Sequence, residues 1–252
     1  MDVRVTGDGP PTPFLSARDR FETEYDLERP VEVRIRSDPD ERTWVGHRDD
    51  RHVLNISAQA ASSAMARELA LHEYAHMRRH EEGHPSHTQD TAEVLFLALA
   101  GKEIERRVLA HCHQIANHTR DIYADDITLR VGPAEKLSAF LESELAAAVA
   151  DRPAPVPGQR LTAVAAPPIT AVNAAFALAL LERHDAIEAD HPIYDLAHAA
   201  ADDAPTIDMD RFREAFRTLT DDPSESEYRR ALADVVAEYV DAQPSTSGPA
   251  AD

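Results

Sequence analysis

The chain has 252 residues, 43% of them hydrophobic, so it can bury a core in one large or two modest domains. Its 46 acidic and 26 basic residues give a net charge of −20. This balance argues against a surface built to neutralise the phosphates of nucleic acids or anionic lipids. We therefore expect no nucleic-acid partner.

The basic residues are almost all arginine, because Lys102 and Lys136 are the only lysines, and aspartate outnumbers glutamate by 25 to 21. Acidic, lysine-poor surfaces keep proteins soluble where salt screens their self-repulsion. We interpret the composition as halophilic, with an acidic protein from a GC-rich genome as the alternative. No signal peptide is visible, and the longest apolar run, 94–100, is too short for a membrane span. We expect a cytoplasmic protein without membrane insertion, and the single Cys112 excludes an intramolecular disulfide.

The first part of the chain predicts a small sheet. Residues 1–30 are polar and weakly patterned, and we expect them to form an N-terminal leader on the surface. Residues 31–37, 42–48 and 52–57 carry strand patterns and are separated by short turns. Such spacings are typical of an antiparallel meander.

The remainder of the chain predicts helices. The stretch 58–82 has no Gly or Pro and is followed by Gly83 and Pro85, which predicts one long helix. Further helices are expected at 90–111, 114–129, 133–150, 169–184, 208–220 and 224–242. A sheet followed by helices predicts a helix-rich α+β fold. The expected parts are a core domain at 31–150, a Pro-rich linker at 151–160, a helical region at 161–242 and a disordered tail at 243–252.

One motif in the first predicted helix carries chemistry. His72-Glu73-Tyr74-Ala75-His76 is an HExxH sequence. Residues i and i+4 share one face of a helix, so both imidazoles can reach one Zn²⁺ at about 2.0–2.1 Å. Glu73 lies about 100° around the helix, beside the metal, where it can accept a proton from a zinc-bound water. Chance alone yields the motif in about one in twenty chains of this composition, so its position in a predicted helix after a strand is what supports it.

A catalytic zinc ion needs a third protein ligand, and the sequence leaves its identity open. Eight of the thirteen histidines lie between residues 72 and 118. Asp121 lies on a predicted helix downstream of the motif, and His118, three residues earlier, can share its face. The other candidates for the third ligand are Glu93, Glu103 and Asp126.

The HExxH sequence and the segment Arg120-Asp121-Ile122-Tyr123-Ala124-Asp125 together resemble the gluzincin metallopeptidases. The nearest branch includes the heat-shock protease HtpX and the CAAX prenyl protease, whose third ligand is the Glu of an E-x-x-A-D pattern. The resemblance implies one Zn²⁺ per chain on His72, His76 and Asp121, with Glu73 as general base and Asp125 holding a ligating histidine. The chain departs from that branch in carrying Asp at the ligand position and in lacking membrane helices.

The resemblance covers roughly residues 50–130, and the chain as a whole resembles an uncharacterised haloarchaeal protein family. It implies a zinc-dependent metallopeptidase that hydrolyses a peptide or protein substrate through a zinc-activated water. We expect the substrate to pair with strand 52–57, at the edge of the sheet above the active helix. The alternatives are a zinc-binding but inactive partner-binding module, and a regulatory protease of the IrrE/ImmA type that acts on a single protein.

Several residues near the motif have weaker assignments. A histidine four residues after the motif, here His80, also occurs in IrrE/ImmA-type proteins. We expect His80, His84 and His87 to lie in a solvated helix end and loop, with the rim of the cleft or a second metal site as the functional alternatives. Arg120 and Tyr123 are candidates to polarise a substrate carbonyl, with a place in the core as the simpler expectation for Tyr123.

Overall fold

The computed structural model describes residues 1–38, 43–151 and 166–243, which form a helix-rich α+β fold with a four-stranded sheet. This confirms the predicted fold class. The chain divides into two compact units. Unit 1 comprises Met1–Thr88 and Arg120–Leu137, and unit 2 comprises Gln89–Thr119 and Ser138–Asp252.

The two units do not follow the predicted boundary between a core at 31–150 and a helical region at 161–242. One helix, α6 (Arg106–Val131), contributes its first part to unit 2 and its second part to unit 1. A compact unit is defined by contacts in space, so composition along the chain does not reveal a boundary inside a helix. The predicted linker at 151–160 and tail at 243–252 lie almost entirely outside the described residues.

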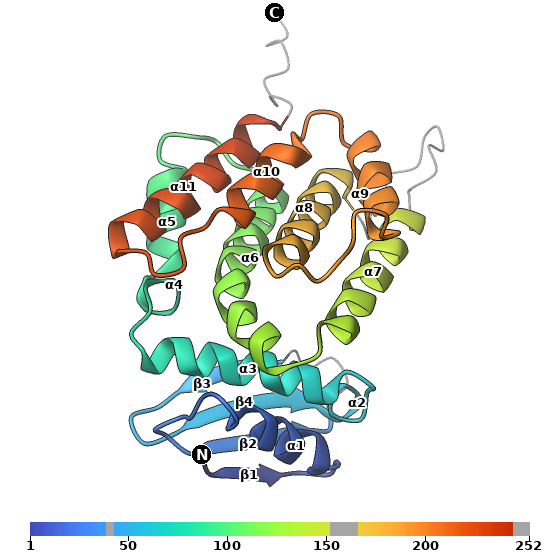
Figure 1. Cartoon of the computed structure of the whole chain (residues 1–252). Coiled ribbons are helices and arrows are strands. Elements are labelled where there is room, and N and C mark those ends of the chain that lie inside the picture. The colour runs from blue at the N-terminus through green and yellow to red at the C-terminus, as the bar shows by residue number, and fades with distance from the viewer. Residues whose placement is uncertain (39–42, 152–165, 244–252) are drawn as a thin grey trace, which may run out of the picture. The chain divides into compact units, whose positions relative to one another are not determined.

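The sheet of unit 1 has the strand order β1-β2-β4-β3 (Figure 1). Its strands are β1 (Val3–Thr6), β2 (Val31–Arg36), β3 (Trp44–His47) and β4 (His52–Ser57). β1 pairs with β2 and β2 with β4 in parallel, whereas β3 and β4 form an antiparallel pair. The predicted antiparallel meander of 31–37, 42–48 and 52–57 is therefore right for β3 and β4 and wrong for β2, because the chain after β2 goes to the edge of the sheet as β3 before it returns as β4, which pairs with β2 in parallel.

The order of the strands also corrects the expected edge of the sheet. β4 lies between β2 and β3, and all its residues are buried. β3 is the edge strand on that side, and α3 (Ala66–Glu81) contacts it. Any strand added to the sheet at this end must therefore pair with β3.

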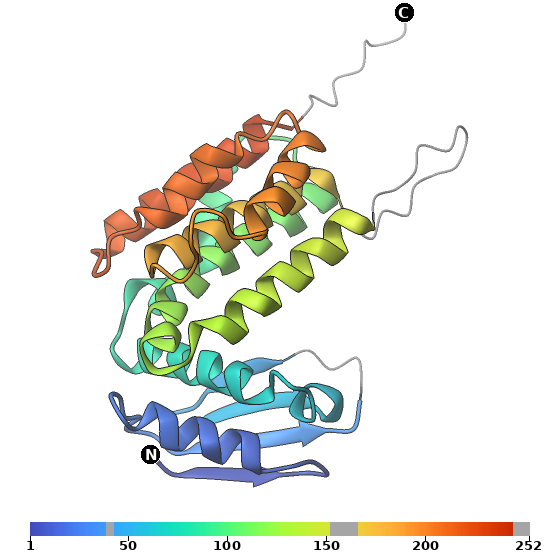
Figure 2. The same ribbon diagram turned by 45° about the vertical axis from the view of Figure 1, so that its right-hand side comes forward.

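The N-terminal segment is part of the core and not a surface leader. Residues 1–30 contribute β1 and the helix α1 (Thr12–Phe21), whose Phe14, Ala17 and Phe21 are fully buried. Figures 1 and 2 show α1 and α3 packed beside each other on the sheet. The turn after β1 needs a glycine: Gly7 has φ +95°, and a Cβ there would lie 2.1 Å from the carbonyl oxygen of Ile35.

The apolar side of α3 packs into this core, which positions the HExxH motif on the opposite side. Leu71, Tyr74 and Met77 belong to one buried cluster with residues of the sheet, α1 and α6. The Tyr74 ring meets Phe21 edge-on, with ring centroids 6.0 Å apart. His72 and His76 are left half-buried on the other side of the helix.

Helix boundaries differ from the prediction in three places. The stretch 58–82 forms two helices, α2 (Ala58–Ala61) and α3, because serines interrupt it: the Ser63 hydroxyl donates to the carbonyl of Ala60 at 2.8 Å. The next helices are α4 (Pro85–Thr88) and α5 (Thr91–Ala98), which ends before Gly101, at φ +77°. The residues predicted to form helices at 90–111 and 114–129 instead form the short helix α5 and the long helix α6. α6 is continuous because no Gly or Pro occurs between 106 and 131.

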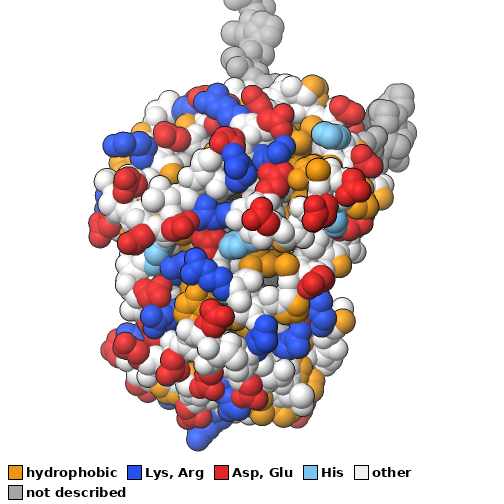
Figure 3. Space-filling model, in the orientation of Figure 1, with side chains coloured by type: hydrophobic (Ala, Val, Ile, Leu, Met, Phe, Trp, Pro, Cys, Tyr) orange, Lys and Arg blue, Asp and Glu red, His pale blue; other side chains and the backbone are white. Residues whose placement is uncertain are grey.

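Unit 2 is helical in its described residues. After α7 (Ala134–Ala150) come α8 (Pro167–Arg183), α9 (Ile193–Asp202), α10 (Met209–Arg217) and α11 (Glu225–Asp241), of which α9 was not predicted. α8 is buried on nearly all sides and packs against α9 and α10, while α11 packs against α5. None of the helices in the described residues combines the length and apolar character that a bilayer span requires. On the face shown in Figure 3, Asp and Glu side chains are scattered among Lys and Arg side chains.

Candidate metal centre

Three side chains of unit 1 bring ligand atoms to one point. His72 and His76 come from α3 and Asp121 from α6, and all three are half-buried. The two Nε2 atoms of the histidines lie 2.9 Å apart. Asp121 Oδ1 lies 3.3 Å from Nε2 of His76 and 3.9 Å from Nε2 of His72. Two residues of a local motif and one carboxylate 45 positions further along the chain therefore share a single small volume.

These separations fit a metal ion held by nitrogen and oxygen ligands. A tetrahedral zinc ion with bonds of about 2.0–2.1 Å places its ligand atoms about 3.3–3.4 Å apart. The three separations, 2.9, 3.3 and 3.9 Å, bracket that value. Two imidazole nitrogens at 2.9 Å repel each other unless a proton or a cation lies between them, so this point suits either a hydrogen bond between the rings or a bound metal ion.

The other ring nitrogen of His72 is held by Asp125. Asp125 Oδ1 lies 2.7 Å from His72 Nδ1, and the Asp125 side chain is only 5% exposed. Asp121 and Asp125 are four residues apart, so one face of α6 presents both carboxylates to α3. Burial lowers the pKa of His72, but the charge and hydrogen bond of Asp125, with the charges of Asp121 and Glu73, raise it to about 10. Asp125 thus occupies the orienting position that the resemblance implies.

The other ring nitrogen of His76 is held by a residue that the sequence analysis placed in solvent. His87 Nε2 lies 2.7 Å from His76 Nδ1. Burial, followed by the charges of His76 and Arg120, lowers the pKa of His87 well below its usual value, so the ring is neutral and can accept this hydrogen bond. Both ligand histidines therefore have fixed ring orientations that direct Nε2 to the shared point.

A short chain of hydrogen bonds supports His87 in turn. Its Nδ1 lies 2.7 Å from the hydroxyl of Ser86, which lies 2.7 Å from Nδ1 of His84. If His76 donates from Nδ1 to Nε2 of His87, then Nδ1 of His87 donates to the Ser86 hydroxyl, and this hydroxyl donates to Nδ1 of His84. The tautomer of His76 thus fixes the tautomers of His87 and His84. His84 is 5% exposed and packs on the ring of Tyr123 at 4.6 Å. The expectation of a solvated loop for His84 and His87 is therefore wrong. The only sign in the sequence of their supporting role was the run of histidines after the motif.

Glu73 lies beside the ligand group. It is half-buried and adjacent to His72 on α3, and its charge adds to those of Asp125 and Asp121 at that imidazole. No group among the described residues hydrogen-bonds to its carboxylate. The carboxylate is thus available to a water molecule or a substrate at the ligand group.

The alternative third ligands are not part of this group. Asp126 is buried on α6 but does not belong to it. His118 lies in unit 2, where its Nε2 is 2.9 Å from Oδ1 of Asn173 and its ring stacks on Phe176 at 4.2 Å. Glu93 and Glu103 also belong to unit 2. Among the open candidates, Asp121 is the one that the described residues bring to the two histidines.

The comparison with known protein families adds one finding. The model of a family of unknown function (DUF5781) matches residues 1–241. The chain belongs to this family. The match covers the ligand group and both units. No curated protein matches the chain, and no solved structure does.

A second group of histidines lies further along α3 and on the neighbouring strands. His52 Nε2 is 3.0 Å from Oε1 of Glu81, and its Nδ1 is 2.9 Å from Nδ1 of His47. Glu81 also accepts the backbone N–H groups of residues 28 and 29, at 2.8 and 2.9 Å. His47 stacks on His80 with ring centroids 3.7 Å apart. This group joins the end of α3 to the sheet, and its carboxylate is occupied by these hydrogen bonds.

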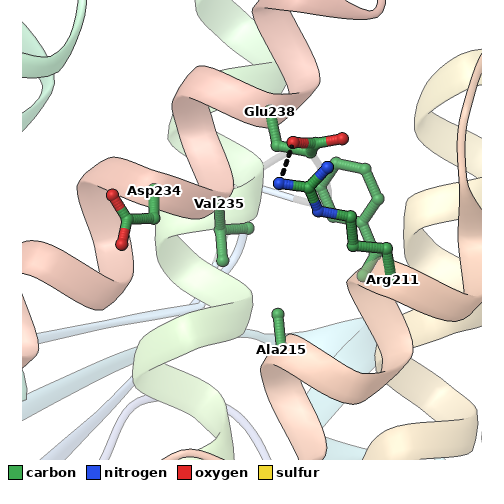
Figure 4. A pocket seen from close by; sticks show the side chains of 6 residues that line it. Arg211, Ala215, Asp234, Val235 and Glu238 are labelled. Atoms are coloured by element: carbon green, nitrogen blue, oxygen red, sulfur yellow. Dashed lines mark ion pairs between the residues drawn. The ribbon is translucent and has the colours of Figure 1, made fainter.

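A hollow in unit 2 has a different character. It measures about 300 Å³, part of it open solvent, and lies between α10 and α11 (Figure 4). Its lining residues are Arg211, Phe212, Ala215, Asp234, Val235 and Glu238. Arg211 is paired with Glu238 at 2.8 Å, and Figure 4 shows Asp234 apart from this pair. The hollow assembles no nucleophile with a base and no ligand group, so the chemistry of unit 1 directs the functional argument.

Proposed function

We propose that the chain is a zinc-dependent metallopeptidase in which His72, His76 and Asp121 hold one zinc ion and Glu73 is the general base. One observation carries the proposal. Three ligand atoms converge within 3.9 Å of one another while Asp125 and His87 engage the remaining nitrogen of each imidazole. Such orienting partners are what a ligating histidine needs to present one nitrogen to a metal.

In this proposal, amide hydrolysis requires both the metal ion and the carboxylate of Glu73. A bound zinc ion supplies a Lewis acid that polarises a carbonyl and lowers the pKa of a water molecule. Glu73 takes one proton from the attacking water as the water oxygen bonds to the carbonyl carbon. It then returns that proton to the amide nitrogen as the C–N bond breaks, so that the products are a carboxylic acid and an amine, and the acid passes its proton to the amine.

The edge of the sheet next to α3 supports a peptide as the substrate. β3 is the edge strand, and its partner on the inner side is β4. A peptide that pairs with β3 extends the sheet along the helix that carries the ligands. Strand addition at β3 replaces the addition at 52–57 that we predicted.

We place this activity in the cytoplasm. The support is compositional: 25 aspartates with only two lysines suit a protein that works in concentrated intracellular salt. The assays below therefore use multimolar KCl.

Elemental analysis of protein purified without chelator tests the site. We expect one zinc ion per chain, lost in both His76→Ala and Asp121→Ala. Zinc that remains in Asp121→Ala would move the third ligand to another residue. A wild-type chain that holds no metal even after zinc is added would refute the proposal.

The role of Glu73 needs a separate measurement. We expect Glu73→Gln to keep its zinc ion and to lose the hydrolysis of a peptide library followed by mass spectrometry. Asp19→Asn, an exposed substitution that also removes one negative charge, serves as the control. Equal turnover in Glu73→Gln and the wild type would contradict the assignment of the base.

A further inference from the structure

Arg120 is a half-buried cation for which the described residues provide no partner. It directly precedes the ligand-group residue Asp121 on α6. Its Nε atom is buried and makes no hydrogen bond. Within the described residues, no ion pair or hydrogen bond joins its guanidinium to any other group.

Neighbouring arginines of unit 1 behave differently. Arg79 donates from Nε to the carbonyl of Tyr123 at 2.9 Å and pairs with Glu82 at 3.2 Å. Arg78 pairs with Glu82 as well, at 2.8 Å. In a chain with 46 acidic and 26 basic residues, carboxylates are in surplus. A half-buried guanidinium with neither a carboxylate nor a carbonyl as partner is therefore an exception among the described residues, and it carries a desolvation cost that no partner offsets.

Three imidazoles lie near Arg120. Burial is the main cause that lowers the pKa values of His47, His80 and His87, and the charge of Arg120 adds to this lowering in each case. His87 in turn holds the ligand His76. The guanidinium thus lies close to these rings and directly precedes a residue of the candidate metal centre, and no carboxylate of the described residues forms an ion pair with it.

We propose that Arg120 binds a carboxylate of the peptide substrate beside the bond to be cleaved. This inference rests on the proposed function, and it names the substrate class: peptides with a carboxylate close to the scissile amide. A guanidinium offers parallel N–H donors that match the two oxygens of a carboxylate. The carboxylate can be the free C-terminus of the peptide or the side chain of an Asp or Glu, and both supply the same group.

Three matched peptide libraries separate these sources, with zinc-loaded protein in multimolar KCl. The first has a free C-terminal carboxylate and no acidic residue, the second is the same library with a C-terminal amide, and the third is the amide library with one Glu at varied positions. We expect the first or the third library to be cleaved about 10- to 100-fold faster than the second, as suits hydrogen bonds to a charged group. The faster library identifies the source of the carboxylate.

Variants of Arg120 connect this preference to the residue. We expect Arg120→Gln to lose the preference, and Arg120→Lys to keep part of it because the charge remains without the paired donors. Arg36→Gln is the matched control, since Arg36 is an exposed arginine at the end of β2. Arg120→Gln also removes an unpaired half-buried charge, so we expect its Tm to be no lower than that of the wild type.

A binding measurement on zinc-free protein provides a readout that does not depend on hydrolysis. Glutarate and its neutral analogue glutaramide are each titrated into the wild type and the variants, and binding is measured by titration calorimetry. We expect glutarate to bind to the wild type and to Arg36→Gln at least tenfold more tightly than to Arg120→Gln.

The outcomes separate this inference from the proposed function. Glutarate binding that depends on Arg120, in a protein that cleaves no peptide, supports the carboxylate site and counts against the peptidase. Hydrolysis with equal rates on all three libraries, or a preference and glutarate binding that persist in Arg120→Gln, overturns the carboxylate site and leaves the peptidase standing.

Discussion

Replacing Asp125 by asparagine removes the negative charge that lies 2.7 Å from Nδ1 of His72 while it keeps the size of the side chain. Burial opposes the protonation of His72, and Asp125 is the largest contributor that raises its pKa to about 10. Without that charge we expect the pKa to return toward about 6.5, the ordinary value for histidine. The variant therefore changes how many protons zinc must displace.

The size of this change follows from the two pKa values. At pH 7.5 a group with a pKa of about 10 is almost fully protonated, so zinc binding to the wild type releases about one proton from His72. A group with a pKa of about 6.5 is only about 10% protonated at that pH, so the contribution of His72 falls to roughly 0.1 proton in Asp125→Asn. The zinc affinity of the wild type should accordingly rise about tenfold per pH unit between pH 7 and 9 relative to that of the variant.

Titration calorimetry in buffers of different ionisation enthalpy counts the released protons. Asp126→Asn is the matched control, because Asp126 is also buried on α6 and the change removes the same charge, but it does not hold His72. We expect its proton release to equal that of the wild type. Equal proton release in Asp125→Asn and the wild type would refute the reasoning that joins Asp125, His72 and the metal.

Three further results are expected. His87→Ala removes the group that holds Nδ1 of His76 and should weaken zinc binding about 10- to 100-fold, whereas His87→Gln should recover part of the loss. A competition titration with a chromophoric chelator measures the Kd, and an unchanged Kd in the alanine variant would count against this role. Burial lowers the pKa of His47 to about 3, so the contribution of the neutral ring to stability is present above pH 6.5 and is lost as the pH falls. His47→Phe should flatten the fall of Tm between pH 6.5 and 5, which corresponds to a change in the free energy of unfolding of less than about 1.4 kcal/mol per pH unit. Parallel Tm curves would contradict this. Phe14→Ala should lower the free energy of unfolding by about 3–5 kcal/mol, because Phe14 is fully buried, while Phe96→Ala, at 73% exposure, should change it by less than about 0.5 kcal/mol; similar losses in both would show that the N-terminal segment is not part of the core.

Features that depend on neighbours in the sequence could be predicted from the sequence. The strand at 31–36 follows an alternating pattern, the strands at 44–47 and 52–57 are short segments bounded by turns, and most helices follow stretches without Gly or Pro. The face shared by His72 and His76 follows from helix periodicity alone, as does the face shared by Asp121 and Asp125. β1 carried the same alternation at Val3 and Val5, but over too few residues to stand out from a leader.

Features that depend on distant residues were decided by the tertiary structure. Whether two strands pair in parallel depends on how the chain between them crosses the sheet, which no local pattern records. Only the packing of α6 against α3 selects Asp121 over Asp126 as the third ligand and leaves His118 with Asn173. The same holds for His87 and Arg120. His87 hydrogen-bonds to His76, whereas Arg120 pairs with no carboxylate among the described residues. Both outcomes depend on which side chains the fold brings together in space.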